Sequence, residues 1–121
     1  MMYRNHSEGK AGIRLSGNSC IVCGWCKTNN LGESLLIGAH VRPFSSGYEF
    51  DKSDNIIALC PNHHAEFDGF AFTIDSKTKQ LIFLDKNDPN NGVSVASKIT
   101  HIKENYLAYR QYQYNKANGI Y

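Results

Sequence analysis

The 121-residue sequence predicts a single α+β domain, and three features of the chain indicate it. Two short apolar runs, residues 35–41 and 56–59, have the length of strands and are separated by a polar segment. Pro61 then stands where the first turn of a helix favours proline. A second pair of apolar runs is followed by a segment with helical spacing. A chain of this length builds one hydrophobic core, so we expect one domain over 1–121.

The first half of the chain is expected to contain few regular elements. Residues 1–19 hold three glycines and scattered apolar positions, which indicates an irregular N-terminal arm or a short element. A cysteine-rich turn occupies 20–26, and the strand at 35–41 ends before Pro43. Residues 44–54 read as a surface loop of about ten residues.

The second half is expected to contain two helices and a hairpin. The helix after the second strand is predicted from about Pro61 to Phe67 or Asp68, with its end at Gly69. Apolar runs at 70–75 and 80–84 flank a turn, which predicts a hairpin. Helical spacing predicts a C-terminal helix over 95–115. The predicted organisation is an arm (1–19), a central core (20–70), a hairpin (71–85) and the C-terminal helix (95–115).

Composition and charge exclude several classes of protein. Apolar residues make up 41% of the chain, and no run approaches the roughly 20 apolar residues that a membrane span needs. Residues 1–17 lack the apolar centre of a signal peptide, so a cytoplasmic location is expected. The net charge of +2 does not favour a large basic face for nucleic acid.

The cysteines have the spacing of metal ligands. Cys20, Cys23 and Cys26 fall within seven residues, and Cys60 precedes His63 by three positions. Disulfides are rare in the cytoplasm, whereas a Cys-x-x-Cys and a distant Cys-x-x-His provide the four ligands of tetrahedral zinc. The alternative is a set of buried free cysteines. We predict a structural zinc, which is useful to a chain with a limited core.

Three cysteines compete for two places at this zinc. Gly24 follows Cys23 as in a zinc-knuckle turn, which favours Cys20 with Cys23; the pair of Cys23 with Cys26 is the alternative. The predicted zinc ligands are Cys20, Cys23, Cys60 and His63, with Cys26 as the alternative cysteine.

A second set of polar side chains is suited to phosphate chemistry. His64 and Asp68 are four residues apart on a helix, so both project from one face and can hold a divalent cation. His63 lies about 100° round the helix and can turn to the zinc. His40 ends an apolar strand, and a neutral imidazole can remove a proton from water near pH 7. The amide of Asn55 can bond backbone across the loop and hold His40 in place.

These residues resemble the HNH endonucleases, specifically the branch of bacterial restriction-type nucleases. The resemblance covers about residues 20–85 and rests on Ala39-His40-Val41-Arg42-Pro43-Phe44, Asp54-Asn55 and Leu59-Cys60-Pro61-Asn62-His63-His64-Ala65-Glu66-Phe67-Asp68. It implies a ββα-metal (His-Me finger) core with a structural zinc, an added hairpin and a C-terminal helix. It also implies His40 as general base, Asn55 as its orienting residue, and His64 and Asp68 as metal ligands. Ala39 stands where many members place a metal-binding side chain.

The resemblance implies hydrolysis of DNA with Mg²⁺ or another divalent cation, and Arg42 is a candidate phosphate contact. A second hypothesis is a zinc-stabilised nucleic-acid-binding module without catalytic activity, which the modest charge and Ala39 favour. A third is a nuclease effector subunit of a larger defence complex. DNA is the expected partner, and a homodimer is compatible with double-strand cutting. The C-terminal tyrosines are expected to pack the helix or to stack on bases.

Overall fold

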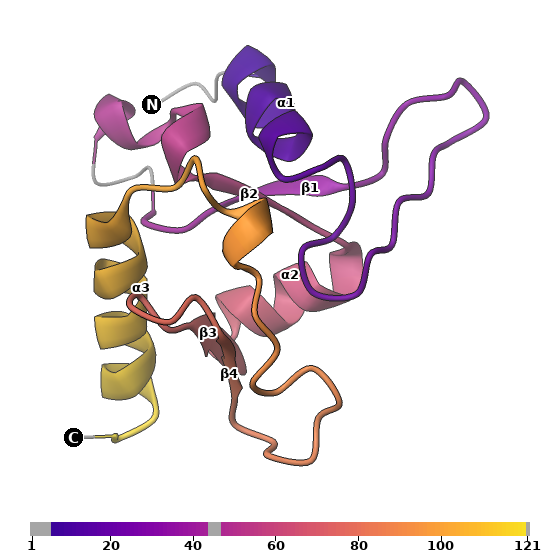
Figure 1. Ribbon diagram of the computed structural model, residues 1–121. Coiled ribbons are helices and arrows are strands. Elements are labelled where there is room, and N and C mark those ends of the chain that lie inside the picture. Colours follow the sequence, from indigo (N-terminus) through magenta and orange to yellow (C-terminus); the bar gives the residue numbers. More distant parts are fainter. Residues whose placement is uncertain (1–5, 44–46, 121) are drawn as a thin grey trace.

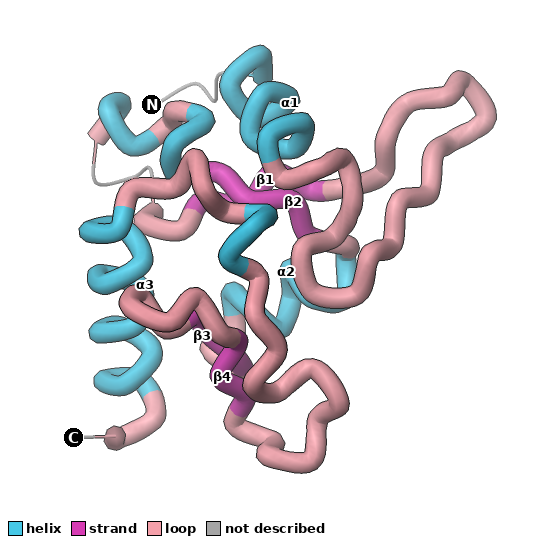
Figure 2. Tube along the Cα trace, viewed as in Figure 1, coloured by secondary structure: helices cyan, strands magenta, loops and turns pink. Residues whose placement is uncertain are grey.

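The computed structural model describes residues 6–43 and 47–120 and has an α+β architecture, as the sequence predicts (Figures 1 and 2). The helices and strands are α1 (His6–Leu15), β1 (Ile37–His40), β2 (Ile56–Leu59), α2 (Pro61–Asp68), β3 (Phe72–Ile74), β4 (Leu81–Phe83) and α3 (Glu104–Ala117). Short 3-10 turns lie at η2 (Tyr48–Phe50), η3 (Ser53–Asn55) and η4 (Ala96–Lys98). Within the described ranges, no helix has the length and apolar character needed to cross a membrane.

The central unit is the antiparallel pair of β1 and β2 with α2 beside it. Ile37 pairs with Leu59 at one end of the strands, and His40 pairs with Ile56 at the other. The helix follows β2 and contacts both strands, with its direction reversed relative to β2 (Figure 1). Cys60 caps its start and Gly69 its end, at the positions the sequence predicts. This arrangement places the histidine-bearing helix along the strand that carries His40.

The second hairpin closes the core on the far side of α2. β3 pairs with β4, and the stacked rings of Phe72 and Phe83 lie 4.8 Å apart. Phe72 also contacts Phe67 of α2, and α3 packs against β3. Backbone N–H groups of Thr78 and Lys77 donate to Asp75 in the turn, which lowers the pKa of this carboxyl. The hairpin is therefore continuous with the core around α2.

The N-terminal segment is more ordered than an irregular arm, because residues 6–15 form α1. Gly9 and Gly12 disfavour a helix on propensity alone, but Gly12 permits close packing on β2. A Cβ placed on Gly12 would lie 2.6 Å from the Ile56 Cβ and 2.9 Å from the Ile56 carbonyl oxygen. The helix is thus held by tertiary contact rather than by intrinsic propensity.

Gly12→Ala is expected to destabilise the fold by about 1–3 kcal/mol, because the added methyl overpacks the contact with Ile56. Gly9→Ala is the matched control on the same helix, since nothing lies within 4 Å of its Cβ position. That variant is expected to be stabilised by about 0.5–1 kcal/mol through helix propensity. Urea unfolding of the two variants measures both effects. Equal stability of the two would contradict the close packing.

The C-terminal helix begins at Glu104 rather than at about Val95, so the predicted start is wrong. Ile99 and Ile102 lie in an irregular connector after η4, and both side chains are buried. Their spacing of three residues is the same as that of two residues on one face of a helix, which explains the wrong start. The imidazole Nε2 of His101 donates to the Ile56 carbonyl, and Lys103 N–H donates to the Asp54 carbonyl. These bonds fasten the connector to the start of β2, which no local pattern signals.

Candidate active site and metal centre

The structure brings four ligand-type side chains together at the start of α2. Ligand atoms of Cys20, Cys23, Cys60 and His63 all lie within 4.8 Å of one another. Cys60 provides the N-cap of α2, where its Sγ also accepts from the His63 backbone N–H. Cys20 and Cys23 reach the helix from a turn whose backbone bonds to β2 through Ile21. The N-terminal turn and the helix are thereby joined at one point.

The distances within this group fit tetrahedral zinc. Bonds of about 2.3 Å to sulfur and 2.0 Å to nitrogen separate two sulfurs by about 3.8 Å, and a sulfur from a nitrogen by about 3.5 Å. The Cys23 and Cys60 sulfurs are 3.9 Å apart, and His63 Nδ1 lies 3.3 Å from Cys60 Sγ and 3.8 Å from Cys20 Sγ. Three sulfurs and one imidazole nitrogen are therefore suited to a closed structural site.

The thiols of this group ionise unequally. Burial opposes the ionisation of Cys20, but hydrogen bonds from nearby backbone N–H groups bring its pKa below the ordinary value. Burial raises the pKa of Cys23 to about 11, and the adjacent Cys20 adds to the rise. A bound cation would stabilise the ionised form of both cysteines, because thiolates rather than thiols ligate metals. Cys26 is exposed and is not a member of the group, and all four cysteines lie in the described segments as free thiols.

His40 lies at the end of β1 and contacts Asp51. Its neighbours Ala39 and Val41 are buried in the apolar core, so the His40 imidazole points to the opposite face of the strand. There Nε2 lies 2.7 Å from Asp51 Oδ1, and the two side chains are 10% and 5% exposed. Asp51 was not among the predicted site residues. It belongs to the loop that returns to β2, and no motif spacing marks it.

Asn55 holds the two ends of this loop together. Its side-chain Nδ2 donates to the carbonyls of Arg42 and Phe50, each at 2.7 Å, and its Oδ1 accepts from Arg42 N–H at 2.9 Å. The residue is completely buried. These are the backbone bonds across the loop that its position before β2 suggests. Asn55 thereby fixes the backbone immediately after His40.

Arg42 is stacked between elements far apart in the sequence. Its guanidinium carbon lies 4.4 Å from the centre of the Phe50 ring and 4.2 Å from that of Tyr109 on α3. Phe50 in turn meets Tyr106 edge-on, at 5.5 Å. Aromatic rings restrain a guanidinium without neutralising its charge. Arg42 is consequently held in one orientation two residues after His40.

His64 and Asp68 lie together on the exposed side of α2. His64 Nε2 is 3.1 Å from Asp68 Oδ2, and the side chains are 32% and 60% exposed. This separation suits neighbouring ligands of an octahedral cation, which are about 3 Å apart for bonds near 2.1 Å. Across the described residues, the cysteine–histidine group is the only cluster of three or more ligand-type side chains. A cation here would take its other ligands from water or substrate.

Ala39 adds no ligand to this pair. It is 3% exposed and belongs to the apolar core beneath β1.

The C-terminal end of α2 is anchored by Arg110 of α3. Its guanidinium lies over the rings of Phe67 and Phe70 and donates to the Phe67 carbonyl. Burial lowers the pKa of Arg110, and the nearby Asp68 opposes this shift. A cation bonded to a final carbonyl stabilises a helix end. Arg110 thus holds the turn that carries Asp68.

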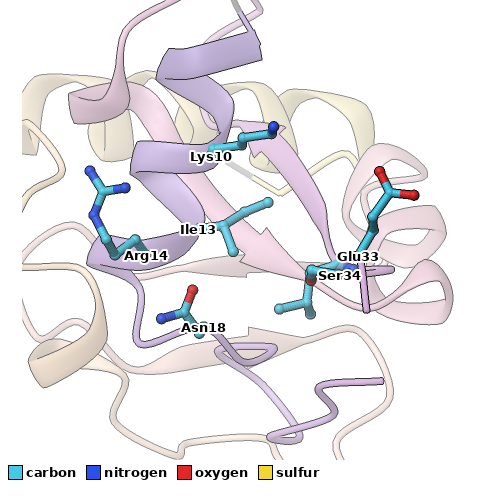
Figure 3. A pocket seen from close by; sticks show the side chains of 7 residues that line it. Lys10, Ile13, Arg14, Asn18, Glu33 and Ser34 are labelled. Atoms are coloured by element: carbon cyan, nitrogen blue, oxygen red, sulfur yellow. Dashed lines mark hydrogen bonds between the residues drawn. The ribbon is translucent and has the colours of Figure 1, made fainter. Parts of the chain in front are cut away.

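A separate hollow of about 450 Å³ lies between α1 and the projecting segment 27–35 (Figure 3). Lys10 and Arg14 of α1 line it on one side, and Glu33 and Ser34 line it on the other. It shares no residue with the His40–Asp51 pair, with the His64–Asp68 pair or with the cysteine–histidine group. The hollow therefore contributes no ligand to the site.

The chain is similar to known proteins both in sequence and in structure. Residues 20–75 match a family model described as HNH endonuclease. Among solved structures, the modification-dependent TagI restriction endonuclease aligns with a TM-score of 0.72 and 25% sequence identity. The alignment covers 91% of this chain and 38% of the TagI chain. No curated protein matches the sequence.

Proposed function

Because this chain belongs to the HNH endonuclease family, we propose that it hydrolyses phosphodiester bonds of DNA with His40 as the general base. The observation that carries the proposal is the family match itself, which spans His40, Asn55, His64 and Asp68. Membership supports nuclease activity at the level of the family.

His40 takes a proton from a water molecule as that water attacks phosphorus in line with the departing 3′ oxygen. Asn55 keeps the backbone after His40 in place, so the imidazole approaches the water from a fixed direction. The products carry 5′-phosphate and 3′-hydroxyl ends. The buried surroundings of His40 support this assignment, because they restrict its rotation.

His64 and Asp68 are proposed to hold the catalytic divalent cation, Mg²⁺ or a related ion. When bound there, such a cation stabilises the negative charge that develops on phosphate oxygens during hydrolysis. Arg110 holds the turn of α2 that presents Asp68, and the i, i+4 spacing directs both ligands to one side. Zn²⁺ at Cys20, Cys23, Cys60 and His63 is proposed to be structural, because its four ligands leave no open position.

Arg42 is proposed to bind a phosphate beside the scissile bond, restrained by Phe50 and Tyr109. Tyr109→Leu is expected to slow DNA cleavage about two- to fivefold, because it removes one of the two ring contacts, each worth about 0.5–1 kcal/mol. Steady-state cleavage of plasmid measures the effect. Tyr112→Leu on the same helix is the matched control, since Tyr112 is 60% exposed.

The proposal also requires that Tyr109→Leu act through Arg42. In an Arg42→Ala background, Tyr109→Leu should therefore produce little further loss. An equal loss in both backgrounds would assign Tyr109 to helix packing alone.

The proposed function is tested by incubating the zinc-loaded chain with supercoiled plasmid and Mg²⁺, Mn²⁺ or Ni²⁺. Nicking or linearisation that depends on the added ion, and that His64→Ala abolishes, is the expected result. End-labelling should then detect 5′-phosphate termini. DNA binding without cleavage under every ion, unchanged in His64→Ala, would instead support the zinc-stabilised binding module.

The partial coverage of TagI favours a second candidate, a nuclease effector that acts within a larger restriction or defence assembly. TagI is described as modification-dependent. By analogy, target choice for this module would come from a recognition element outside residues 6–120. Cleavage that appears only when such an element is supplied would distinguish this candidate from an autonomous nuclease.

A further inference from the structure

From the contact between the loop and β1, we infer that Asp51 is the positioning residue that sets the tautomer of His40. The inference rests on the proposed role of His40 as general base. Asp51 Oδ1 lies 2.7 Å from His40 Nε2, and Asp51 is 4% exposed. Neither the family match nor the TagI comparison assigns a role to this aspartate.

The chemistry of the two groups fixes the direction of the bond. An ionised carboxylate only accepts hydrogen bonds, so Nε2 of His40 carries the proton and donates it to Asp51. In a neutral imidazole the lone pair then resides on Nδ1, which becomes the basic nitrogen. Asp51 thereby selects which nitrogen of His40 removes the proton from water.

The surroundings of Asp51 hold its carboxylate in place beside His40. The aspartate follows η2 and precedes η3, in the loop whose ends Asn55 bonds together. With that loop held, the carboxylate is kept at one distance from the strand that carries His40. A buried carboxylate beside an imidazole also stabilises the imidazolium that forms when the base accepts its proton. Burial of a carboxylate is costly, and the contact with His40 offsets part of this cost.

Asp51→Asn is the decisive variant, because it keeps the size of the side chain and removes its charge. An amide can donate to Nε2 and so favour the wrong tautomer. We expect kcat to fall about 10²–10⁴-fold and KM for DNA to change less than about twofold, since only the base is affected. Glu49→Gln, an exposed carboxylate two residues earlier, is the matched control and should cleave as the unchanged chain does.

Two readouts separate positioning from a structural role. In a His40→Ala background, Asp51→Asn should cause no further loss of cleavage, because the group it positions is gone. Long-range ¹H–¹⁵N NMR of the His40 ring should show the Nε2–H tautomer in the unchanged chain and a shift toward Nδ1–H in Asp51→Asn. A thermal melt and zinc content equal to those of the unchanged chain confirm that the variant is folded.

The inference is overturned if the unchanged chain holds His40 in the Nδ1–H tautomer, a result that needs no variant to fold. It is also overturned if the chain cleaves DNA and Asp51→Asn cleaves it within about threefold of the same rate. If the unchanged chain shows no cleavage, the proposed function fails. The tautomer then decides the role of Asp51 alone, with a shift in Asp51→Asn supporting it and no shift overturning it.

Discussion

Cys60→Ser is expected to unfold the chain and to abolish its zinc content. Structural zinc contributes about 10–16 kcal/mol of apparent binding free energy in small zinc-dependent folds. That contribution equals or exceeds the roughly 5–15 kcal/mol of net stability of a typical domain. The serine removes one of the four proposed zinc ligands, whereas its hydroxyl can still cap α2. Circular dichroism during heating, together with metal analysis of the purified protein, measures both losses.

The matched control for this variant is Cys26→Ser, the same substitution at an exposed cysteine outside the group. It should keep one zinc per chain and the melting temperature of the unchanged protein. Loss of zinc from Cys26→Ser, with retention in Cys20→Ser, would instead show that Cys23 pairs with Cys26. Variants are preferable to a chelator here, because a chelator would also remove the ion proposed for His64 and Asp68.

His40→Ala is expected to reduce DNA cleavage about 10²–10⁴-fold, the contribution of a well-placed general base. The loss should lie in kcat, since the imidazole is proposed to act on water in the transition state rather than to bind DNA. Zinc content should not change, because His40 is not a member of the cysteine–histidine group. Plasmid cleavage at saturating divalent ion, followed over time, measures the rate.

The control for this experiment is His6→Ala, the same substitution at an exposed position of α1. It should cleave at the unchanged rate. Full activity in His40→Ala would remove the role assigned to His40, and with it the reason for a positioning aspartate. Reduced DNA affinity with unchanged kcat would place His40 among the binding residues instead.

Local patterns in the sequence were sufficient for the central unit. Proline and glycine at positions 61 and 69 mark both ends of α2, and the apolar runs locate the two strands of the first pair. The Cys-x-x-Cys and Cys-x-x-His spacings locate the residues that the structure brings together beside that helix. Each of these signals lies within a few residues of the feature that it predicts.

The remaining features depend on contacts between distant segments. Asp51 meets His40 across a loop, and Tyr109 reaches Arg42 from α3, so neither pair has a spacing that could reveal it. Helix α1 is stabilised by the fit of Gly12 against Ile56, which overrides the propensity of glycine. The connector before α3 has apolar residues at helical spacing, but its His101 side chain bonds to β2 and its Lys103 backbone N–H bonds to the loop instead.

The contacts of Gly12 and Arg110 have a practical consequence for anyone grafting this domain onto a DNA-targeting protein. The family match covers residues 20–75. Two supports lie outside it: α1 covers one face of β2, and Arg110 secures the last turn of α2. A cassette trimmed to the matched residues would lose both supports. Fusion junctions belong before α1 and after α3, where they leave these two contacts intact.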